Sequence, residues 1–251
     1  MKIDDIKNKI TSVEGWLAPE EVEFLYRQAK KLENKGVIVE IGSYKGKSTI
    51  CLAGGSEAGK SIKVYAVDPY ITDFEHKKFN ESKSSFEDFK KNIKNAGLEY
   101  LIEPIIKKSK DAVKNWNKPI EFLWIDGDHS YIGAKEDFIL WEPFVVDGGI
   151  IAFHDCDDTN VQRVIKEYIF TSPYFSEVGI ANRIAFGTKR LRPISLMEKI
   201  RNRLIFFLIK NRALFRRMPF PKKTLDLIAR FGKKSLKLNT TLNYKTEKII
   251  K

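Results

Sequence analysis

The sequence predicts an α/β fold built on a mostly parallel sheet. Short apolar, β-branched runs of strand length alternate with segments of helical periodicity between residues 19 and 170. The runs lack polar alternation, as strands buried on both faces do. Polar residues follow the strands, with acids at Asp68, Asp126 and Asp155, and in parallel sheets ligands bind at the carboxyl ends of strands.

The elements follow one another in a regular order. Pro19 and two glutamates begin the first predicted helix, Gly54 and Gly55 are expected to stop the second, and Gly97 ends the third. Pro104 marks its strand as an edge strand, because proline cannot donate to a sheet ladder. The predicted strands are 37–41, 63–68, 101–106, 120–126 and 148–155, followed by a hairpin at 176–187. The predicted helices are 19–34, 47–55, 84–97, 109–116, 134–144 and 159–170.

Charge divides the chain near Lys189. The 251 residues carry a net charge of +12, but residues 189–251 hold 19 basic and 3 acidic residues, so the first 188 residues are mildly acidic. We therefore expect an N-terminal helical segment at 1–35, a ligand-binding domain at 36–188 and a basic extension at 189–251. No apolar run reaches the roughly 18 residues of a membrane span, and the charged N-terminus is unlike a signal peptide. Two cysteines make no disulfide framework, which favours a cytoplasmic protein.

The stretch "VEIGSYKGKST" forms a glycine turn between a strand and a helix. A phosphate-binding P-loop has four residues between its first glycine and the Gly-Lys-Ser that follows. Here only three residues separate Gly42 from Gly46. Tyr44 also breaks the dinucleotide fingerprint. Asp68, 26 residues after Gly42, is placed to accept ribose hydroxyls, and Glu40 lies under the turn. The pattern favours a ligand with a ribose and no phosphate, against the alternative of a plain strand-to-helix turn.

Three stretches, "VEIGSYKGKST", "VYAVDPY" and "IEFLWIDGDHSYIGAKEDFILWEPFVVDGGIIAFHD", resemble class I S-adenosylmethionine-dependent methyltransferases. The last is similar to a subgroup that includes macrolide-sugar O-methyltransferases and cephalosporin-hydroxylase-like proteins. The resemblance covers roughly residues 14–188 and implies a seven-stranded Rossmann-like sheet with an antiparallel last strand. It implies S-adenosylmethionine as cofactor and O-methylation of a small molecule or sugar as the reaction. The expected cofactor-binding residues are Glu40, Gly42, Ser43, Gly46, Ser48, Asp68, Ser109 and Asp126.

Acids after two neighbouring strands could share a cation. Asp126 and Asp155 follow strands about 4.8 Å apart, and hard cations bind carboxylate oxygens. The resemblance supports magnesium here, but where relatives have two carboxylates this chain has His154-Asp155, and imidazole suits softer metals. We therefore take Asp126, Asp155 and His154 as candidate ligands of Mg²⁺ or another divalent cation. The alternative is a pair of solvated loop acids or helix N-caps, with Asp157 and Asp158 capping the helix that starts near Thr159.

His129, three residues after Asp126, is the candidate general base. A hydroxyl must lose its proton as the methyl group arrives, and histidine titrates nearest to working pH. The resemblance places a base at this offset and Asp126 beside it in the catalytic set. A capping role at a helix start is the alternative. His76, within the charged connection 69–82, is a weaker candidate for holding the acceptor.

The basic extension has an amphipathic character at 195–234, with "LIFFLI" flanked by Arg and Lys. This pattern favours a membrane surface, so that the protein would be peripheral at the inner membrane, or a partner protein. Nucleic acid is less favoured because the aromatic residues cluster with aliphatic ones. Residues 235–251 are expected to be disordered, and the sequence leaves open a homo-oligomer.

Three alternatives to a small-molecule methyltransferase stay open. A nucleic-acid methyltransferase would use the basic extension as its footprint, although no Asn-Pro-Pro-Tyr/Phe-type site is present. A non-catalytic protein could use the same scaffold for binding. The cephalosporin-hydroxylase likeness also allows metal-dependent hydroxylation.

Overall fold

The structure, a computed structural model, describes residues 1–71 and 85–210. His76, Ser84 at the predicted start of the third helix, and the stretch 211–251 lie outside the described residues, so their predictions are untested.

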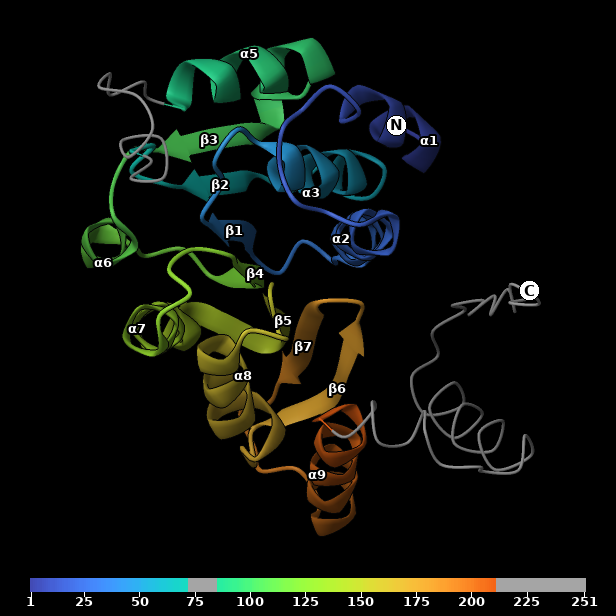
Figure 1. Cartoon of the computed structure of the whole chain (residues 1–251), viewed down its shortest axis with the longest axis vertical. Coiled ribbons are helices and arrows are strands. Elements are labelled where there is room, and N and C mark those ends of the chain that lie inside the picture. Colours follow the sequence, from blue (N-terminus) through green and yellow to red (C-terminus); the bar gives the residue numbers. More distant parts are fainter. Residues whose placement is uncertain (72–84, 211–251) are drawn as a thin grey trace, which may run out of the picture. The chain divides into compact units, whose positions relative to one another are not determined.

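A seven-stranded sheet forms the centre of the fold, in the order β3-β2-β1-β4-β5-β7-β6 (Figure 1). β7 pairs antiparallel with both β5 and β6, and the pairs from β3 to β5 are parallel. This confirms the Rossmann-like sheet with an antiparallel last strand, and it places Pro104 on edge strand β3 as predicted. The strands are β1 Val37–Ile41, β2 Val64–Val67, β3 Ile102–Ile105, β4 Ile120–Ile125, β5 Val145–Phe153, β6 Phe175–Ala181 and β7 Ile184–Lys189.

Helices cover both faces of the sheet. α1, α2 and α3 lie on one side, whereas α6, α7 and α8 lie on the other (Figure 1). β1 and β4, at the centre, are almost wholly buried, which explains their continuous apolar runs. The helices are α1 Ile3–Lys9, α2 Pro19–Lys31, α3 Lys47–Glu57, α5 Phe86–Ala96, α6 Ser109–Ala112, α7 Tyr131–Trp141, α8 Thr159–Ile165 and α9 Leu196–Lys210.

The prediction that two glycines stop α3 was wrong, because α3 runs through both of them to Glu57. A Cβ atom on Gly54 would lie 2.1 Å from Ile6 of α1, and one on Gly55 would lie 2.2 Å from the Tyr26 carbonyl oxygen of α2. These glycines therefore permit close helix packing rather than a helix end. Both residues are buried within the helix.

Other helices and strands begin or end a few residues away from their predicted positions. α7 begins at Tyr131 rather than at 134, because the Ser130 hydroxyl caps it by accepting a hydrogen bond from the Gly133 amide. β5 begins at Val145 rather than at 148. The helix expected at 159–170 is α8 followed by a single π-helical turn, Lys166–Phe170.

The chain divides into two compact units, Met1–Arg203 and Leu204–Lys251, with α9 crossing the division. Within the first unit, the Asn202 amide of α9 donates to the Phe175 carbonyl oxygen at 2.8 Å and holds the start of α9 to β6. Within residues 1–71 and 85–210, no helix combines the length and the apolar character that crossing a membrane requires.

Candidate active site

The crevice between β1 and β4 is where the strand order reverses. After β1 the chain builds outward to β3 and then returns to the other side of β1, which opens a crevice at the carboxyl ends of β1 and β4. The glycine turn follows β1, and Asp126 follows β4. A Cβ on Gly42 would lie 2.2 Å from the Asp126 carbonyl oxygen. The two turns are therefore in direct backbone contact.

The glycine turn is held by Asp68. Gly42 and Gly46 have φ angles of +83° and +88°, which side chains other than glycine rarely adopt. The amides of Ser43 and Tyr44 both donate to Asp68 Oδ2, each at 2.8 Å. Asp68 thus lies beside the turn, where a ribose was expected, and part of its hydrogen-bonding capacity already fixes the turn.

Glu40 lies fully buried beneath the turn, with 0% of its surface exposed. Its Oε2 accepts a hydrogen bond from the Thr49 hydroxyl, but among the described residues Oε1 has no partner, and neither has the Ser43 hydroxyl. Burial raises the pKa of Glu40 to about 7, although nearby hydroxyl groups, including that of Ser48, lower it. Unsatisfied buried polar atoms are rare in folded proteins and often mark a site completed by a ligand.

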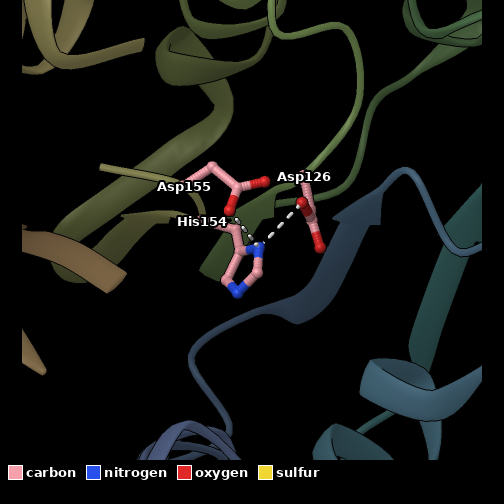
Figure 2. A group of neighbouring side chains, drawn as sticks. All are labelled: Asp126, His154 and Asp155. Atoms are coloured by element: carbon pink, nitrogen blue, oxygen red, sulfur yellow. Dashed lines mark ion pairs between the residues drawn. The ribbon is translucent and has the colours of Figure 1, made fainter. Parts of the chain in front are cut away.

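Asp126, His154 and Asp155 converge at the ends of β4 and β5 (Figure 2). His154 Nδ1 lies 3.3 Å from Asp126 Oδ1 and 3.4 Å from Asp155 Oδ1. One potential ligand atom from each residue lies within 4.8 Å of the others. The two acids therefore lie close together at adjacent strand ends, as expected, and the His154 imidazole contacts both.

The far side of His154 faces Glu21, the third residue of α2. His154 Nε2 lies 3.3 Å from Glu21 Oε2, and both side chains are almost completely buried. Burial opposes a charge on His154, but hydrogen bonds with the three carboxylates around it outweigh that effect and raise its pKa to about 12. The same contact lowers the pKa of Glu21 against the effect of its burial. These carboxylates therefore favour the protonated form of His154, and its ring bridges α2 to the strand ends.

Arg183, in the turn between β6 and β7, closes the cluster from the other side. Its backbone amide donates to Glu21 Oε1 at 3.0 Å, and its guanidinium pairs with Asp155 and with Asp157, the latter at 3.0 Å. Burial raises the pKa of Asp155, yet the His154 and Arg183 charges outweigh this and hold it below its usual value.

His129 lies at the mouth of the same cluster, with 47% of its side chain exposed. Its Nε2 lies 3.2 Å from Asp155 Oδ2 and 3.6 Å from Asp126 Oδ1. The nearby carboxylates of Asp126 and Asp155 raise the pKa of His129, although its partial burial opposes this. An N–H on Nε2 would point at the carboxylates, which leaves Nδ1 as the basic nitrogen.

Two predicted residues have structural partners. The Ser109 hydroxyl accepts a hydrogen bond from the Trp141 indole at 2.7 Å. Asp158 caps α8, since its Oδ1 accepts from the amides of Asn160 and Val161. The capping alternative for this acid is therefore confirmed, and Asp158 is not part of the cluster.

Sequence reasoning missed Glu21 and Arg183. Glu21 was taken only as a favourable charge in the first turn of a helix. It lies four residues before Leu25 on the apolar face of α2, and a charge at that position is a signal of a buried partner. Arg183 had no comparable signal, because only the three-dimensional turn brings it to the cluster.

Comparison with known proteins agrees with this geometry. Residues 39–156 match a protein family described as a methyltransferase domain. The fold is similar to that of an O-methyltransferase from Bacillus cereus solved with S-adenosylhomocysteine, with 18% identity, 75% of this chain and 92% of that chain covered, and a TM-score of 0.55.

Two further O-methyltransferases have similar structures. NovP has 17% identity, with 68% of this chain and 80% of that chain covered and a TM-score of 0.57. TomG from Streptomyces achromogenes, solved with S-adenosylmethionine and involved in tomaymycin synthesis, has 13% identity, with 75% and 89% covered and a TM-score of 0.53. These likenesses show the shared fold, and the family match shows a methyltransferase domain at its centre. Residues 39–156 therefore match a methyltransferase domain, within a fold that the chain shares with S-adenosylmethionine-dependent O-methyltransferases.

Proposed function

We propose that the protein transfers the methyl group of S-adenosylmethionine to a hydroxyl oxygen of a small molecule, with a sugar hydroxyl as the favoured acceptor. The observation that carries this proposal is the position of His129. Its Nε2 lies 3.2 Å from Asp155 and 3.6 Å from Asp126, and the backbone of Asp126 packs against Gly42 of the glycine turn. A base beside a cofactor turn suits removal of the proton from an attacking hydroxyl.

The cofactor would lie over the glycine turn. Gly42 and Gly46 give that turn its shape, and Asp68 would accept hydrogen bonds from the ribose hydroxyls. The unpartnered oxygens of Glu40 and Ser43 fit a ligand that brings a hydrogen-bond donor, such as an α-ammonium group. Ser48, Ser109 and Asp126 complete the proposed cofactor-binding set.

The reaction assigns a role to each atom. The acceptor oxygen forms a bond to the methyl carbon, and the carbon–sulfur bond breaks with its electron pair going to sulfur, which leaves S-adenosylhomocysteine. The acceptor proton passes to Nδ1 of His129. Asp126 and Asp155 orient the ring through Nε2 and stabilise the imidazolium that forms.

A divalent cation is the second part of the proposal, with Asp126, Asp155 and His154 as its ligands. Nε2 of His154 already faces Glu21, so a neutral His154 would keep its proton there and present Nδ1 to the cation, as metal-bound histidines usually do. A bound cation would lower the pKa of the acceptor hydroxyl. Because His154 must first lose its Nδ1 proton, the site suits a nitrogen-binding metal such as Mn²⁺ better than Mg²⁺.

Titration calorimetry tests the cation. After dialysis against EDTA, Mn²⁺ should bind once per chain, more tightly at pH 8 than at pH 6, and Asp155→Asn should abolish binding. Heats for Mg²⁺ and Mn²⁺ that do not differ from buffer would remove the cation from the proposal.

The methyl-transfer proposal is tested with labelled cofactor. Purified protein is incubated with S-adenosylmethionine carrying a tritiated methyl group and the small-molecule fraction of a bacterial extract. Label should appear in a base-stable methyl ether with the wild-type protein and should be lost with His129→Asn. Label in RNA would instead support the nucleic-acid alternative, and binding of cofactor without any transfer would support a non-catalytic scaffold.

We also propose that the C-terminal region contacts the inner membrane surface from a cytoplasmic protein. The described part of this region, α9, carries exposed apolar side chains at helical spacing, and residues 189–251 hold 19 basic residues against 3 acidic ones. The exposed side chains include Leu196, Met197, Ile200 and Leu204. The full chain should sediment with vesicles containing phosphatidylglycerol and not with phosphatidylcholine alone, and Ile200→Glu should weaken this. Binding of the protein to RNA without binding to vesicles would contradict this proposal. Analytical ultracentrifugation of the same sample gives the oligomeric state.

A further inference from the structure

An exposed aromatic pair stands beside the glycine turn. The rings of Trp16 and Tyr44 stack with centroids 5.7 Å apart and an interplanar angle of 28°. Trp16 is 73% exposed, whereas Trp124 and Trp141 are fully buried. An exposed aromatic face beside a candidate site offers a surface on which part of a ligand can pack.

The pair is built into the turn. Tyr44 has a φ angle of 46°, unusual for a residue with a large side chain, and its amide donates to Asp68. The Tyr44 hydroxyl donates to Glu14 Oε1 at 3.1 Å, and the Lys47 ammonium donates to the Gly15 carbonyl oxygen at 3.1 Å. The segment carrying Trp16 is thus fastened to the turn immediately before the tryptophan.

The same segment leads to the acid and histidine cluster. Ala18, two residues beyond Trp16, donates its amide to Glu21 Oε2 at 2.7 Å, and that oxygen lies 3.3 Å from His154 Nε2. Two extended residues span at most about 7 Å, so Trp16 lies close to the entry of α2. The segment that carries Trp16 is therefore tied at one end to the turn expected to hold cofactor and at the other, through Glu21, to the cluster at the strand ends.

We propose that Trp16, supported by Tyr44, is the face on which a sugar ring of the methyl acceptor packs. The axial C–H bonds of a pyranose carry partial positive charge and pack against the negative face of an aromatic ring, while the hydroxyl groups at the ring edge stay free for polar partners. The carboxylates of the cluster and His129 would be those partners. This assignment rests on the proposed function, because it names the acceptor of that reaction.

The two variants Trp16→Ala and Trp16→Phe separate stacking from other effects. Trp16→Ala removes the face, Trp16→Phe keeps most of it, and Tyr174→Ala is the control for losing an exposed aromatic ring elsewhere, since Tyr174 is 45% exposed next to β6. Saturation-transfer NMR is recorded on each protein saturated with S-adenosylhomocysteine. The probes are methyl β-D-glucopyranoside, methyl α-L-rhamnopyranoside and catechol.

The wild-type protein, Trp16→Phe and Tyr174→Ala should transfer saturation to protons on one face of a glycoside ring, and Trp16→Ala should lose at least three-quarters of that transfer. Calorimetry should give the same S-adenosylhomocysteine affinity for all four proteins within a factor of two. A glycoside signal that is absent, or unchanged in Trp16→Ala, overturns the inference while the cofactor data leave the proposed function standing. Trp16-dependent binding of catechol alone overturns the choice of a sugar, and loss of S-adenosylhomocysteine binding in Trp16→Ala assigns the pair to the cofactor. Failure of the wild-type protein to bind S-adenosylhomocysteine refutes the proposed function itself.

Discussion

The buried carboxyl group of Glu40 makes the stability of the protein depend on pH in a defined direction. Burial raises its pKa from 4.5 to about 7 in the folded state. Between these values the folded state binds more protons than the unfolded state, so the free energy of unfolding falls as pH rises and levels off above pH 7. The shift of about 2.5 pKa units corresponds to a loss of roughly 3 kcal/mol, at about 1.4 kcal/mol per unit.

Glu40→Gln removes this titration and keeps the shape of the side chain. Urea unfolding at pH 5, 6, 7 and 8 should show the variant gaining roughly 3 kcal/mol relative to wild type between the ends of the range. Glu103→Gln removes a carboxyl group from the exposed side of edge strand β3 and controls for the loss of one acidic residue. If the difference between Glu40→Gln and wild type is constant from pH 5 to 8, the reasoning about the buried carboxyl group is refuted.

Three further substitutions test the site. Gly42→Ala places a methyl group 2.2 Å from the Asp126 carbonyl oxygen of the facing turn. It should lower the free energy of unfolding by about 2 kcal/mol or more and abolish the binding of S-adenosylhomocysteine measured by calorimetry. An unchanged affinity would contradict this reasoning. Glu21→Gln removes a buried carboxylate partner of His154 and should lower the free energy of unfolding in urea by about 3–5 kcal/mol. The exposed control Glu20→Gln should change it by no more than about 0.5 kcal/mol. Equal effects of the two substitutions would argue against the buried pair. His129→Asn should lower kcat by about 10²–10⁴-fold without changing cofactor affinity, and wild-type kcat should rise with pH as His129, whose pKa is raised, loses its proton; a pH-independent rate would exclude it as the base.

Much of the fold followed from local patterns. Continuous apolar runs marked the strands buried on both faces, and the acids after them lay at the correct edge because parallel strands end together. Helix ends were less predictable. Gly54 and Gly55 carry the usual sign of a helix stop, and only the packing of α1 and α2 against α3 gives them their real purpose.

The residues of the candidate site also differ in whether the sequence alone could predict them. Asp126, His129 and Asp155 could be found because each lies within four residues of the end of a strand, and strand order then brings them together. Glu21 reaches the cluster from a helix more than 100 residues earlier in the chain, and Arg183 from a later hairpin. No local pattern encodes those distances. Glu21 adds a third carboxylate to the surroundings of His154, and this contact helps to raise the pKa of the ring.

Titration calorimetry with two adenosine-containing ligands, S-adenosylmethionine and ATP, tests the central claim most directly. The crevice above Gly42 is proposed to accept a ribose and an amino acid group but no polyphosphate, because its turn is one residue short of a P-loop and is fixed by a carboxylate. S-adenosylmethionine should bind the full-length protein once per chain, with the affinity lost in Gly42→Ala, and ATP should give no heat. Binding of ATP without binding of S-adenosylmethionine would contradict the account.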